Sequence, residues 1–423
     1  MGITKETEKL YTKFLHEELI PAMGCTEPIA LAYAAAYAAK LLGKTPQNYL
    51  VECSGNIIKN VMAVTVPQTE GMRGIQVAAL VGALGGDPDL KLEVLSTVKP
   101  CHLDAVKAAL EANLVTVKPL DTTHTLHIIV RVEADGEWAS VEIIDAHTNL
   151  GTIIKNGKVI HERVETVAVD NSNERAALNV RDILEYADTV DLNDVKEVLE
   201  RQLAYNTAIS NEGLTNPWGA CVGQTLLKYR PDDLPTRAKA AAAAGSDARM
   251  NGCTMPVVIN SGSGNQGITI SMPVRVYAES MGVSHEKLLR ALCAANLTAI
   301  HQKTSIGRLS AFCGAVSAAT GAAVGIAYLE DASYEVIAQT ITNSLCNVGG
   351  MVCDGAKSSC AAKIASSVEA AILGYEMAKD QQGFQHGEGI VKQNVEETIA
   401  AVGRMAASGM CRTDKEILDI MVG

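Results

Sequence analysis

Four cysteines in the last third of the chain have the residue type of a metal site but not a familiar spacing. Cys353 and Cys360 enclose the polar stretch CDGAKSSC, and Cys313 and Cys346 precede them in glycine-containing segments. Zinc sites usually pair ligands as C-x₂₋₄-C, and bacterial ferredoxins use C-x₂-C-x₂-C; neither spacing occurs in this sequence. Three well-separated thiols could instead hold three irons of a [4Fe–4S] cluster, leaving the fourth iron open as a Lewis acid.

A further cysteine, Cys25, stands where a helix is expected to begin. In the stretch PAMGCTEP, Thr26 is a natural N-cap and Pro28 suits the first helical turn. A thiol at this position faces the positive end of the helix dipole, which lowers its pKa and raises the thiolate fraction near neutral pH. The alternative is a cysteine that merely packs beside the cap.

The stretch NSGSGNQG, residues 260–267, contains the pattern G-x-G-x-x-G. A dinucleotide site would need a strand before it, a helix directly after it and an acidic residue about 20 positions further on. The following residues, ITISMPVRVY, read at least as well as a strand, so we favour a turn whose backbone N–H groups hold a small anion such as a carboxylate. A plain flexible loop is the remaining alternative. The residues of this candidate nest are Ser261, Ser263, Gly264, Asn265 and Gln266.

The first 165 residues change in character after an opening pair of helices. Residues 4–19 predict one helix, and an alanine-rich segment ending at Gly43 predicts a second. From Tyr49 to about Ile160 the segments are rich in β-branched residues. Asp-Gly at 135–136 and Asn-Gly at 156–157 predict two hairpin turns there.

After about residue 170 the apolar pattern becomes helical, as in VRDILEYADTV and HEKLLRALCAANLTAIHQ. Only 4% of the residues are aromatic, and many are alanine or glycine, so we expect helices packed at close distance. The predicted fold class is α+β, with a mostly helical C-terminal bundle and a smaller α/β lobe containing antiparallel hairpins. The predicted domains are an N-terminal helical hairpin packing on the bundle (1–44), the lobe (45–165) and the helical domain that carries the candidate cluster cysteines (166–423).

Length and charge narrow the class of protein. A chain of 423 residues exceeds the roughly 250–300 at which one core stops growing, so more than one compact unit is expected. Its 48 acidic and 36 basic side chains provide no broad positive field, which argues against a nucleic-acid partner. The charged start lacks the apolar region of a secretory signal, and the apolar stretches are too interrupted for a membrane span. We therefore expect a cytoplasmic protein without a membrane partner, in which eleven cysteines form no disulfide framework.

Five motifs in one order resemble the L-cysteine desulfidase family, which is related to the iron–sulfur L-serine dehydratase α chain and was once catalogued as an uncharacterised protein family. They are GCTEP near the N-terminus, SGNIIKNV at 54–61, SGSGNQG, IGRLSAFCGA and CDGAKSSC, so the resemblance covers nearly the whole chain. The dehydratases carry one thiol about forty residues before a C-D-x…C pair, which corresponds here to Cys313, Cys353 with Asp354, and Cys360. The closing loop is shorter here than in the dehydratases, which counts against strict serine dehydratase activity.

The resemblance implies a serine dehydratase α-chain-like bundle and a β-elimination that needs no pyridoxal phosphate. L-Cysteine would give sulfide and aminoacrylate, which hydrolyses to pyruvate and ammonia. A [4Fe–4S] cluster would be held by Cys313, Cys353 and Cys360, with Cys25 opposite as the thiolate that takes the Cα proton. The nest and further polar groups would hold the carboxylate and ammonium of this small amino-acid substrate. These further groups are Asn56, Asn60 and Lys303.

Two other functions remain open from the sequence. An L-serine dehydratase would use the same chemistry, whereas a redox sensor would hold the cluster without turnover and would tolerate loss of Cys25 or of the nest. Cys346 stays open as a replacement for one of the three ligands, and Lys59 and Arg308 as either site residues or structural ion pairs. The oligomeric state, a homodimer included, is not decided by the sequence.

Overall fold

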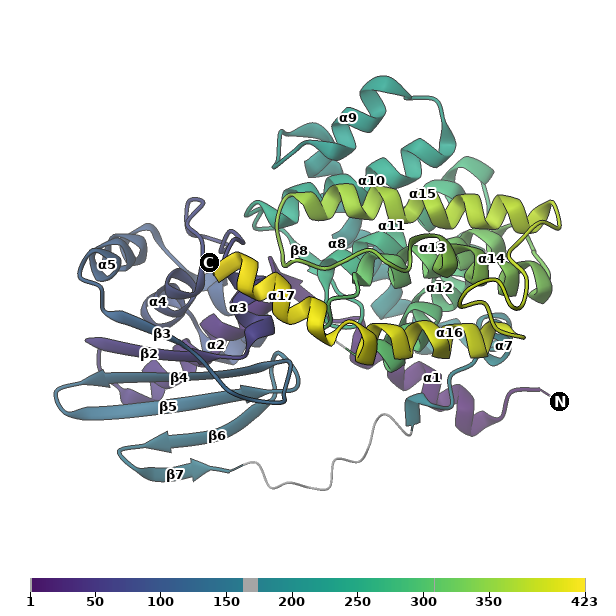
Figure 1. Cartoon of the computed structure of the whole chain (residues 1–423). Helices are drawn as coiled ribbons and strands as arrows, with labels where there is room; N and C mark the ends of the chain where they lie inside the picture. The colour runs from purple at the N-terminus through teal and green to yellow at the C-terminus, as the bar shows by residue number, and fades with distance from the viewer. Residues whose placement is uncertain (1, 163–173, 308, 423) are drawn as a thin grey trace.

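The computed structural model describes residues 2–162, 174–307 and 309–422, and Figure 1 shows a sheet-containing lobe at one end and a helical bundle at the other. The predicted fold class is confirmed: the bundle is mostly helical, and the smaller lobe contains antiparallel hairpins. Among the described residues, every helix is too short or too polar to cross a lipid bilayer.

The lobe is built on a six-stranded sheet of order β3-β2-β4-β5-β6-β7, in which β2 and β3 are parallel and the other neighbours antiparallel. Burial alternates along β4, as expected for a strand with one face on the core. The strands are β2 (Asn48–Cys53), β3 (Val115–Pro119), β4 (His127–Ala134), β5 (Glu137–Ile144), β6 (Leu150–Lys155) and β7 (Lys158–His161).

Both predicted hairpin turns are confirmed. Asp135 and Gly136 join β4 to β5 with φ of 52° and 79°, and Asn156 and Gly157 join β6 to β7 with φ of 50° and 80°. Positive φ at both central residues is the geometry of a type I′ turn, which Asp-Gly and Asn-Gly sequences favour. The turns were readable from the sequence because the required backbone conformation restricts the residue types.

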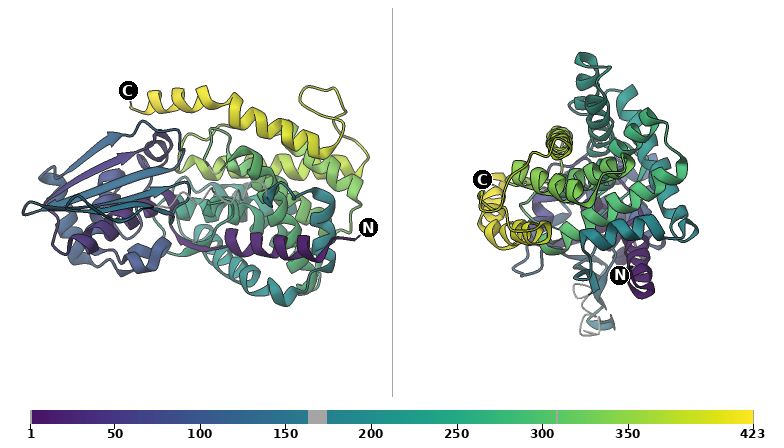
Figure 2. Two further views of the ribbon diagram at one scale, coloured as in Figure 1. Left: turned by 90° about the horizontal axis from the view of Figure 1, so that it is seen from below. Right: turned by 90° about the vertical axis from the view of Figure 1, so that its right-hand side faces the viewer.

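Helices cover one face of the sheet, as Figure 2 shows. Helix α2 packs against β4, β5 and α4, and α4 packs against α5. The short helix α3 begins directly after β2 and lies on the side of the lobe that is nearest the bundle (Figure 1). The helical segments of the lobe are α2 (Thr26–Leu42), α3 (Gly55–Val61), α4 (Ile75–Gly85), η1 (Pro88–Thr97) and α5 (Pro100–Glu111).

The bundle is formed by helices from both ends of the chain. Its small residues allow the expected close approach: a Cβ on Gly213 of α8 would lie 2.0 Å from the carbonyl oxygen of Ala244 in α10, and one on Gly321 of α13 would lie 2.5 Å from that of Ala295 in α12. The helices are α1 (Lys5–Glu18), α7 (Val180–Thr189), α8 (Lys196–Thr215), α9 (Val222–Tyr229), α10 (Leu234–Met250), α11 (Gly264–Met281), α12 (His285–Ile306), α13 (Gly314–Leu329), α14 (Tyr334–Val348), α15 (Ser359–Lys379), α16 (Val395–Arg404) and α17 (Cys411–Val422), with the short turns η2 (Leu192–Asp194) and η3 (Met405–Gly409).

The prediction of a strand at ITISMPVRVY is wrong. These residues lie inside α11, which begins at Gly264 and tolerates Pro273 in its interior. The β-branched residues suggested a strand, but this helix is buried nearly all round, and burial overrides local propensity. A helix therefore does follow the glycine-rich loop directly. The strand before it, β8 (Pro256–Val258), pairs antiparallel with β1 (Pro21–Met23), so the parallel sheet of a dinucleotide fold is not what precedes it.

The domain boundaries at 44 and 165 remain predictions, and the second one falls outside the described residues. Contacts nevertheless give the two N-terminal helices different neighbours: α1 packs against α7 and α12 of the bundle, whereas α2 packs on the sheet of the lobe. Strand β1, between them, pairs with β8 of the bundle. The segment that leads into Cys25 is thereby fastened to both parts of the molecule.

Candidate active site

A small cavity of about 100 Å³ is lined by residues of both the lobe and the bundle. Residues from α2 and α3 of the lobe line it together with residues from the bundle. The side chains predicted from the sequence that line it are Cys25, Asn60, Ser263, Asn265, Gln266, Lys303, Cys313, Cys353 and Cys360, and it is also lined by Glu27, Arg249, Met250, Leu309, Ser310, Phe312, Gly314, Ala315, Gly355, Ala356 and Ile364.

A larger surface cleft, of about 910 Å³, lies between α7, α12 and α13 and is less suited to chemistry. Its charged side chains are already paired: Lys287 with Asp331 at 2.6 Å, and the Tyr328 hydroxyl with Asp188 at 2.6 Å. The small cavity instead gathers thiols and polar groups. We therefore treat it as the candidate active site.

Four helices begin at the wall of this cavity. Cys25, Ser263 and Cys313 are the N-cap residues of α2, α11 and α13, and Cys360 lies in the first turn of α15. The first-turn N–H groups and the dipole of each helix favour negative charge nearby. The cavity is thus electrostatically suited to anionic groups such as thiolates and carboxylates.

The loops before α13 and α15 bring two of the candidate ligand cysteines side by side. The backbone N–H of Cys313 donates to Met351 at 3.0 Å, that of Cys353 donates to Ala311 at 2.7 Å, and Phe312 and Val352 form an antiparallel bridge between them. Burial raises the pKa of Cys313 to about 12, and the neighbouring thiols of Cys353 and Cys360 add to the shift. Burial likewise raises the pKa of Cys360.

The residues present fit an iron–sulfur cluster by the chemistry of their donors. Three half-buried thiols line the same cavity, and thiolates are the ligands that such clusters use. Among the described residues, no three His, Cys, Asp or Glu side chains meet tightly enough to hold a single metal ion. A polynuclear cluster differs in that each thiol contacts its own iron, so its ligands need not converge on one point.

The expectation of a lowered pKa at Cys25 is wrong. Cys25, rather than Thr26, is the N-cap of α2, so the thiol does lie at the helix start. However, complete burial and the negative charge of Glu27 raise its pKa well above the ordinary value, although Arg249 opposes the shift. The thiol donates a hydrogen bond to Glu27 Oε2 at 3.0 Å. Desolvation and a neighbouring carboxylate therefore outweigh the helix dipole.

Glu27 is the centre of a buried polar network that the sequence reasoning missed. Its Oε1 accepts from Asn60 Nδ2 at 3.1 Å, and its Oε2 accepts from the Thr26 hydroxyl at 3.1 Å as well as from Cys25. Burial alone would raise the pKa of Glu27, but His147, the Cys25 hydrogen bond and Arg249 together lower it. The side chain is therefore an ionised acceptor facing a thiol. Its place in the motif GCTEP, two residues after the cysteine, was the available signal.

Arg249 is the second residue that the sequence reasoning missed. It stands near the C-terminal end of α10, is 2% exposed, and its Nη1 donates to Asn265 Oδ1 at 3.1 Å. A single arginine closing a helix of mostly small residues was the available signal, because such a helix face is buried.

Three of the predicted site residues lie outside the lining of the cavity. Ser261 donates its hydroxyl to Asn260 Oδ1 at 2.8 Å, Asn56 lies in α3, and Gly264 packs next to Nε of Arg249. A Cβ on Gly264 would lie 2.4 Å from Arg249 Nε. Cys346, the alternative ligand, lies in α14, and burial raises its pKa.

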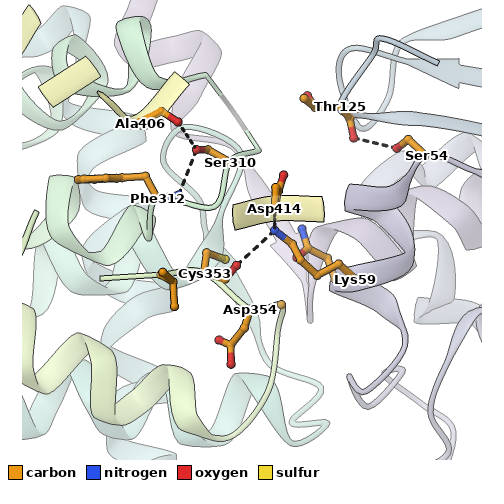
Figure 3. Close-up of polar contacts among 12 residues, drawn as sticks. Ser54, Lys59, Thr125, Ser310, Phe312, Cys353, Asp354, Ala406 and Asp414 are labelled. Carbon is orange, nitrogen blue, oxygen red and sulfur yellow. Dashed lines mark hydrogen bonds and ion pairs between the residues drawn. The ribbon is translucent and has the colours of Figure 1, made fainter. Parts of the chain in front are cut away.

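Lys59 of α3 connects this helix to α17 and to the loop that carries Cys353. Figure 3 shows its position. The side chain is 2% exposed; its Nζ donates to the carbonyl of Cys353 at 3.2 Å and pairs with Asp414 of α17. The neighbouring Ser310 donates to the carbonyl of Ala406 at 3.3 Å, which ties the same region to η3. Arg308, left open with Lys59 in the sequence, lies outside the described residues.

Two lysines hold the loop between Cys353 and Cys360. Asp354 pairs with Lys357 at 2.5 Å and with Lys363 of α15. Partial burial alone would raise the pKa of Asp354, but the two lysines hold it at about 2. The short loop is therefore closed by its own ion pairs.

Comparisons with known proteins identify one family model, and several relatives that match nearly the whole chain. A family model described as serine dehydratase alpha chain matches residues 90–419. A UPF0597 protein of Lachnoclostridium phytofermentans is 51% identical over 96% of this chain and 98% of its own, and one of Treponema denticola is 45% identical over the whole of both chains. A UPF0597 protein of Finegoldia magna is 48% identical over 98% of this chain and 99% of its own.

Proposed function

This chain belongs to the serine dehydratase alpha chain family, and from that premise we propose that it is an iron–sulfur lyase that eliminates sulfide from L-cysteine without pyridoxal phosphate. The reaction breaks the Cα–H and Cβ–S bonds of L-cysteine. It gives hydrogen sulfide and aminoacrylate, whose imine tautomer takes up water to yield pyruvate and ammonia. No electrons are transferred, so the reaction needs no oxidant or reductant.

The observation that carries the proposal is that Cys25, Cys313, Cys353 and Cys360 line one buried cavity. The last three would hold a [4Fe–4S] cluster, whose donor chemistry they fit. When bound, the cluster supplies an iron without a protein ligand, which is a Lewis acid for the substrate. Cys25 reaches the cavity from the N-terminal segment, separate in sequence from the ligands, as a base opposite the cluster should.

Cys25 and Glu27 would act together on the Cα proton. As the Cys25 sulfur takes the proton from substrate, its own proton passes to Glu27 Oε2 along the hydrogen bond of 3.0 Å. Glu27 starts as a carboxylate because of its lowered pKa, and Asn60 and Thr26 hold it in place.

L-Serine is the second candidate substrate, because the matching family model is described by serine dehydratase. The same proton abstraction would then expel hydroxide instead of sulfide. A non-catalytic redox sensor would have no use for a thiol–carboxylate pair opposite the ligands, so we favour an enzyme. The cytoplasmic location remains part of the proposal.

An anaerobic assay of purified protein tests the function. We expect iron and acid-labile sulfide in the preparation, a visible spectrum that changes on adding L-cysteine, and pyruvate and sulfide in equal amounts. Cys25→Ser should keep the absorption and lose roughly 10²- to 10⁴-fold of the turnover, as expected for loss of a general base. Cys101→Ser, at an exposed cysteine, is the control. Loss of iron in Cys25→Ser would make this residue a ligand and contradict the mechanism.

The ligand set is tested by replacing each cysteine in turn. Serine at Cys313, Cys353 or Cys360 should abolish the iron content, whereas Cys346→Ser should retain it. If Cys346→Ser loses iron and one of the other three variants does not, the assignment has to be exchanged between those two residues.

A further inference from the structure

Arg249 is a buried cation whose guanidinium is only partly satisfied by the residues that the structure describes. Its Nε and Nη2 atoms have no hydrogen-bond partner among the described residues, and no carboxylate there lies within ion-pair distance of it. Burying a guanidinium with unsatisfied donors is unfavourable. A buried arginine with unsatisfied donors is expected where a ligand supplies the missing partner. Arg249 lines the cavity described above.

The free edge of Arg249 has the geometry of a carboxylate receptor. Nε and Nη2 point the same way and can donate two parallel hydrogen bonds, which is how arginine binds carboxylates. The hydrogen bond from Nη1 to Asn265 Oδ1 fixes the orientation of the guanidinium and leaves that edge available. Asn265 is therefore a positioning residue for Arg249.

The first turn of α11 lies against this same edge. Gly264 is so close that a Cβ there would lie 2.4 Å from Arg249 Nε, and Ser263 caps the helix without a side-chain hydrogen bond. The N–H groups of this turn have no intrahelical partner and carry the positive end of the dipole. Arg249 and the first turn of α11 can therefore bind the same anionic group.

Two amide oxygens in the cavity wall provide the opposite polarity. Asn60 Oδ1 and Gln266 Oε1 are buried and have no partner among the residues that the structure describes. Because Asn60 Nδ2 donates to the carboxylate of Glu27, its Oδ1 must point away from Glu27. Two acceptors near an ionised carboxylate suit an ammonium group.

We propose that the Nε–Nη2 edge of Arg249, with the first turn of α11, binds the α-carboxylate of a free amino acid whose ammonium is held by Asn60 and Gln266. This rests on the proposed function in taking an amino acid as substrate, and it names the class: small free α-amino acids. The small size of the cavity, about 100 Å³, favours a free amino acid over a peptide. Compounds without the carboxylate, such as cysteamine, lose the contact with Arg249.

Steady-state kinetics of the iron-loaded enzyme test the inference. In Arg249→Lys the charge remains but the fork is lost, so we expect KM for L-cysteine to rise roughly 10- to 100-fold, with a smaller change in kcat. Inhibition by cysteamine should be the same in the variant and the wild type. Arg237→Lys, an exposed arginine of the same helix, is the control and should leave KM unchanged.

Binding of L-alanine, which has no leaving group, separates this inference from the proposed function. Calorimetry should show L-alanine binding to the wild type and not to Arg249→Lys, whether or not L-cysteine is turned over. Turnover of L-cysteine with an unchanged KM in Arg249→Lys would overturn the inference and leave the lyase intact. Binding of L-alanine without any turnover of L-cysteine or L-serine would do the reverse.

Two milder variants keep the test valid if Arg249→Lys does not fold. Asn265→Ala removes only the hydrogen bond to Nη1 and should raise KM severalfold. Gly264→Val places a side chain against Nε and should raise KM more strongly while the iron content is unchanged. Unchanged KM in both variants, with iron retained, would also overturn the proposal.

Discussion

At the scale of single residues, burial decides what the ionisable groups of this protein can do. Cys25 lies at a helix start, which favours thiolate, yet burial and Glu27 raise its pKa. Glu27 is buried too, but its partners lower its pKa. These opposite shifts favour the pair in which the proton is on the Cys25 sulfur and Glu27 is a carboxylate.

Asp247 allows a prediction about pH at the same scale. Burial raises its pKa from 3.8 to about 6, although the N–H groups of Gly223 and Val222 oppose the shift. Between about pH 4 and 6 the folded protein therefore keeps a proton that the unfolded chain releases, so the free energy of unfolding falls as pH rises through this window. The loss is complete above about pH 6 and amounts to about 3 kcal/mol at most.

Asp247→Asn should remove this dependence. Its stability relative to the wild type should be greater at about pH 7.5 than at about pH 4.5, as measured by urea unfolding followed by circular dichroism. Asp233→Asn is the matched control on the same helix. Because its hydrogen bonds to Thr236 lower the pKa of Asp233, this variant should lose stability at both pH values. A constant difference between Asp247→Asn and wild type would contradict the assignment.

At the scale of elements, the C-terminal helix α17 is linked to the loop that carries Cys353 by Lys59 of α3. Lys59 joins Asp414 of α17 to the carbonyl of Cys353. In the neighbouring loop before α13, Ser310 donates a hydrogen bond to Ala406 of η3. Figure 2 shows the segment from α16 through α17 running along the bundle to the lobe. The side chain that the sequence left open is thus structural and adjacent to the site.

Two variants separate the contacts of Lys59. Asp414→Asn should loosen α17 and accelerate amide exchange in residues 411–422, while iron loss to a chelator stays at the wild-type rate. Lys59→Met should accelerate amide exchange in residues 411–422 and also accelerate iron loss. We expect iron to be lost about tenfold faster, because a hydrogen bond from a charged donor is worth about 1.5 kcal/mol. Equal rates of iron loss in Lys59→Met and wild type would show that the Cys353 carbonyl does not depend on this lysine.

At the scale of the whole molecule, the site exists only where separate segments meet. Cys25 and Asn60 come from the N-terminal part of the chain, and the three candidate ligands come from loops before α13 and α15. A cluster that binds these loops in the folded state and not in the unfolded chain must stabilise the whole fold.

Removal of the metal should therefore lower Tm. We expect the chelator-treated protein, compared anaerobically with the loaded protein, to melt at least about 5 °C lower. Cys346→Ser should show the same difference, whereas Cys353→Ser should melt at one temperature with or without chelator. Identical melting of loaded and stripped wild type would contradict a cluster bridging these segments.

From the sequence alone we could predict the fold class, the two type I′ turns and nine of the twenty residues that line the cavity. Turn geometry restricts residue types, so Asp135 with Gly136 and Asn156 with Gly157 were readable locally. The cysteines and the glycine-rich loop stood out because their chemistry and backbone freedom are properties of the residues themselves.

The tertiary structure was needed to show that residues 268–277 are helical, that the pKa of Cys25 is raised, and that Nε and Nη2 of Arg249 have no partner among the described residues. Each of these depends on what surrounds a residue. Burial overrides the strand propensity of β-branched side chains, and desolvation with a neighbouring carboxylate exceeds the helix dipole at Cys25. An arginine shows that it lacks a counter-charge only when every neighbour is in place, and those neighbours come from segments far apart in the chain.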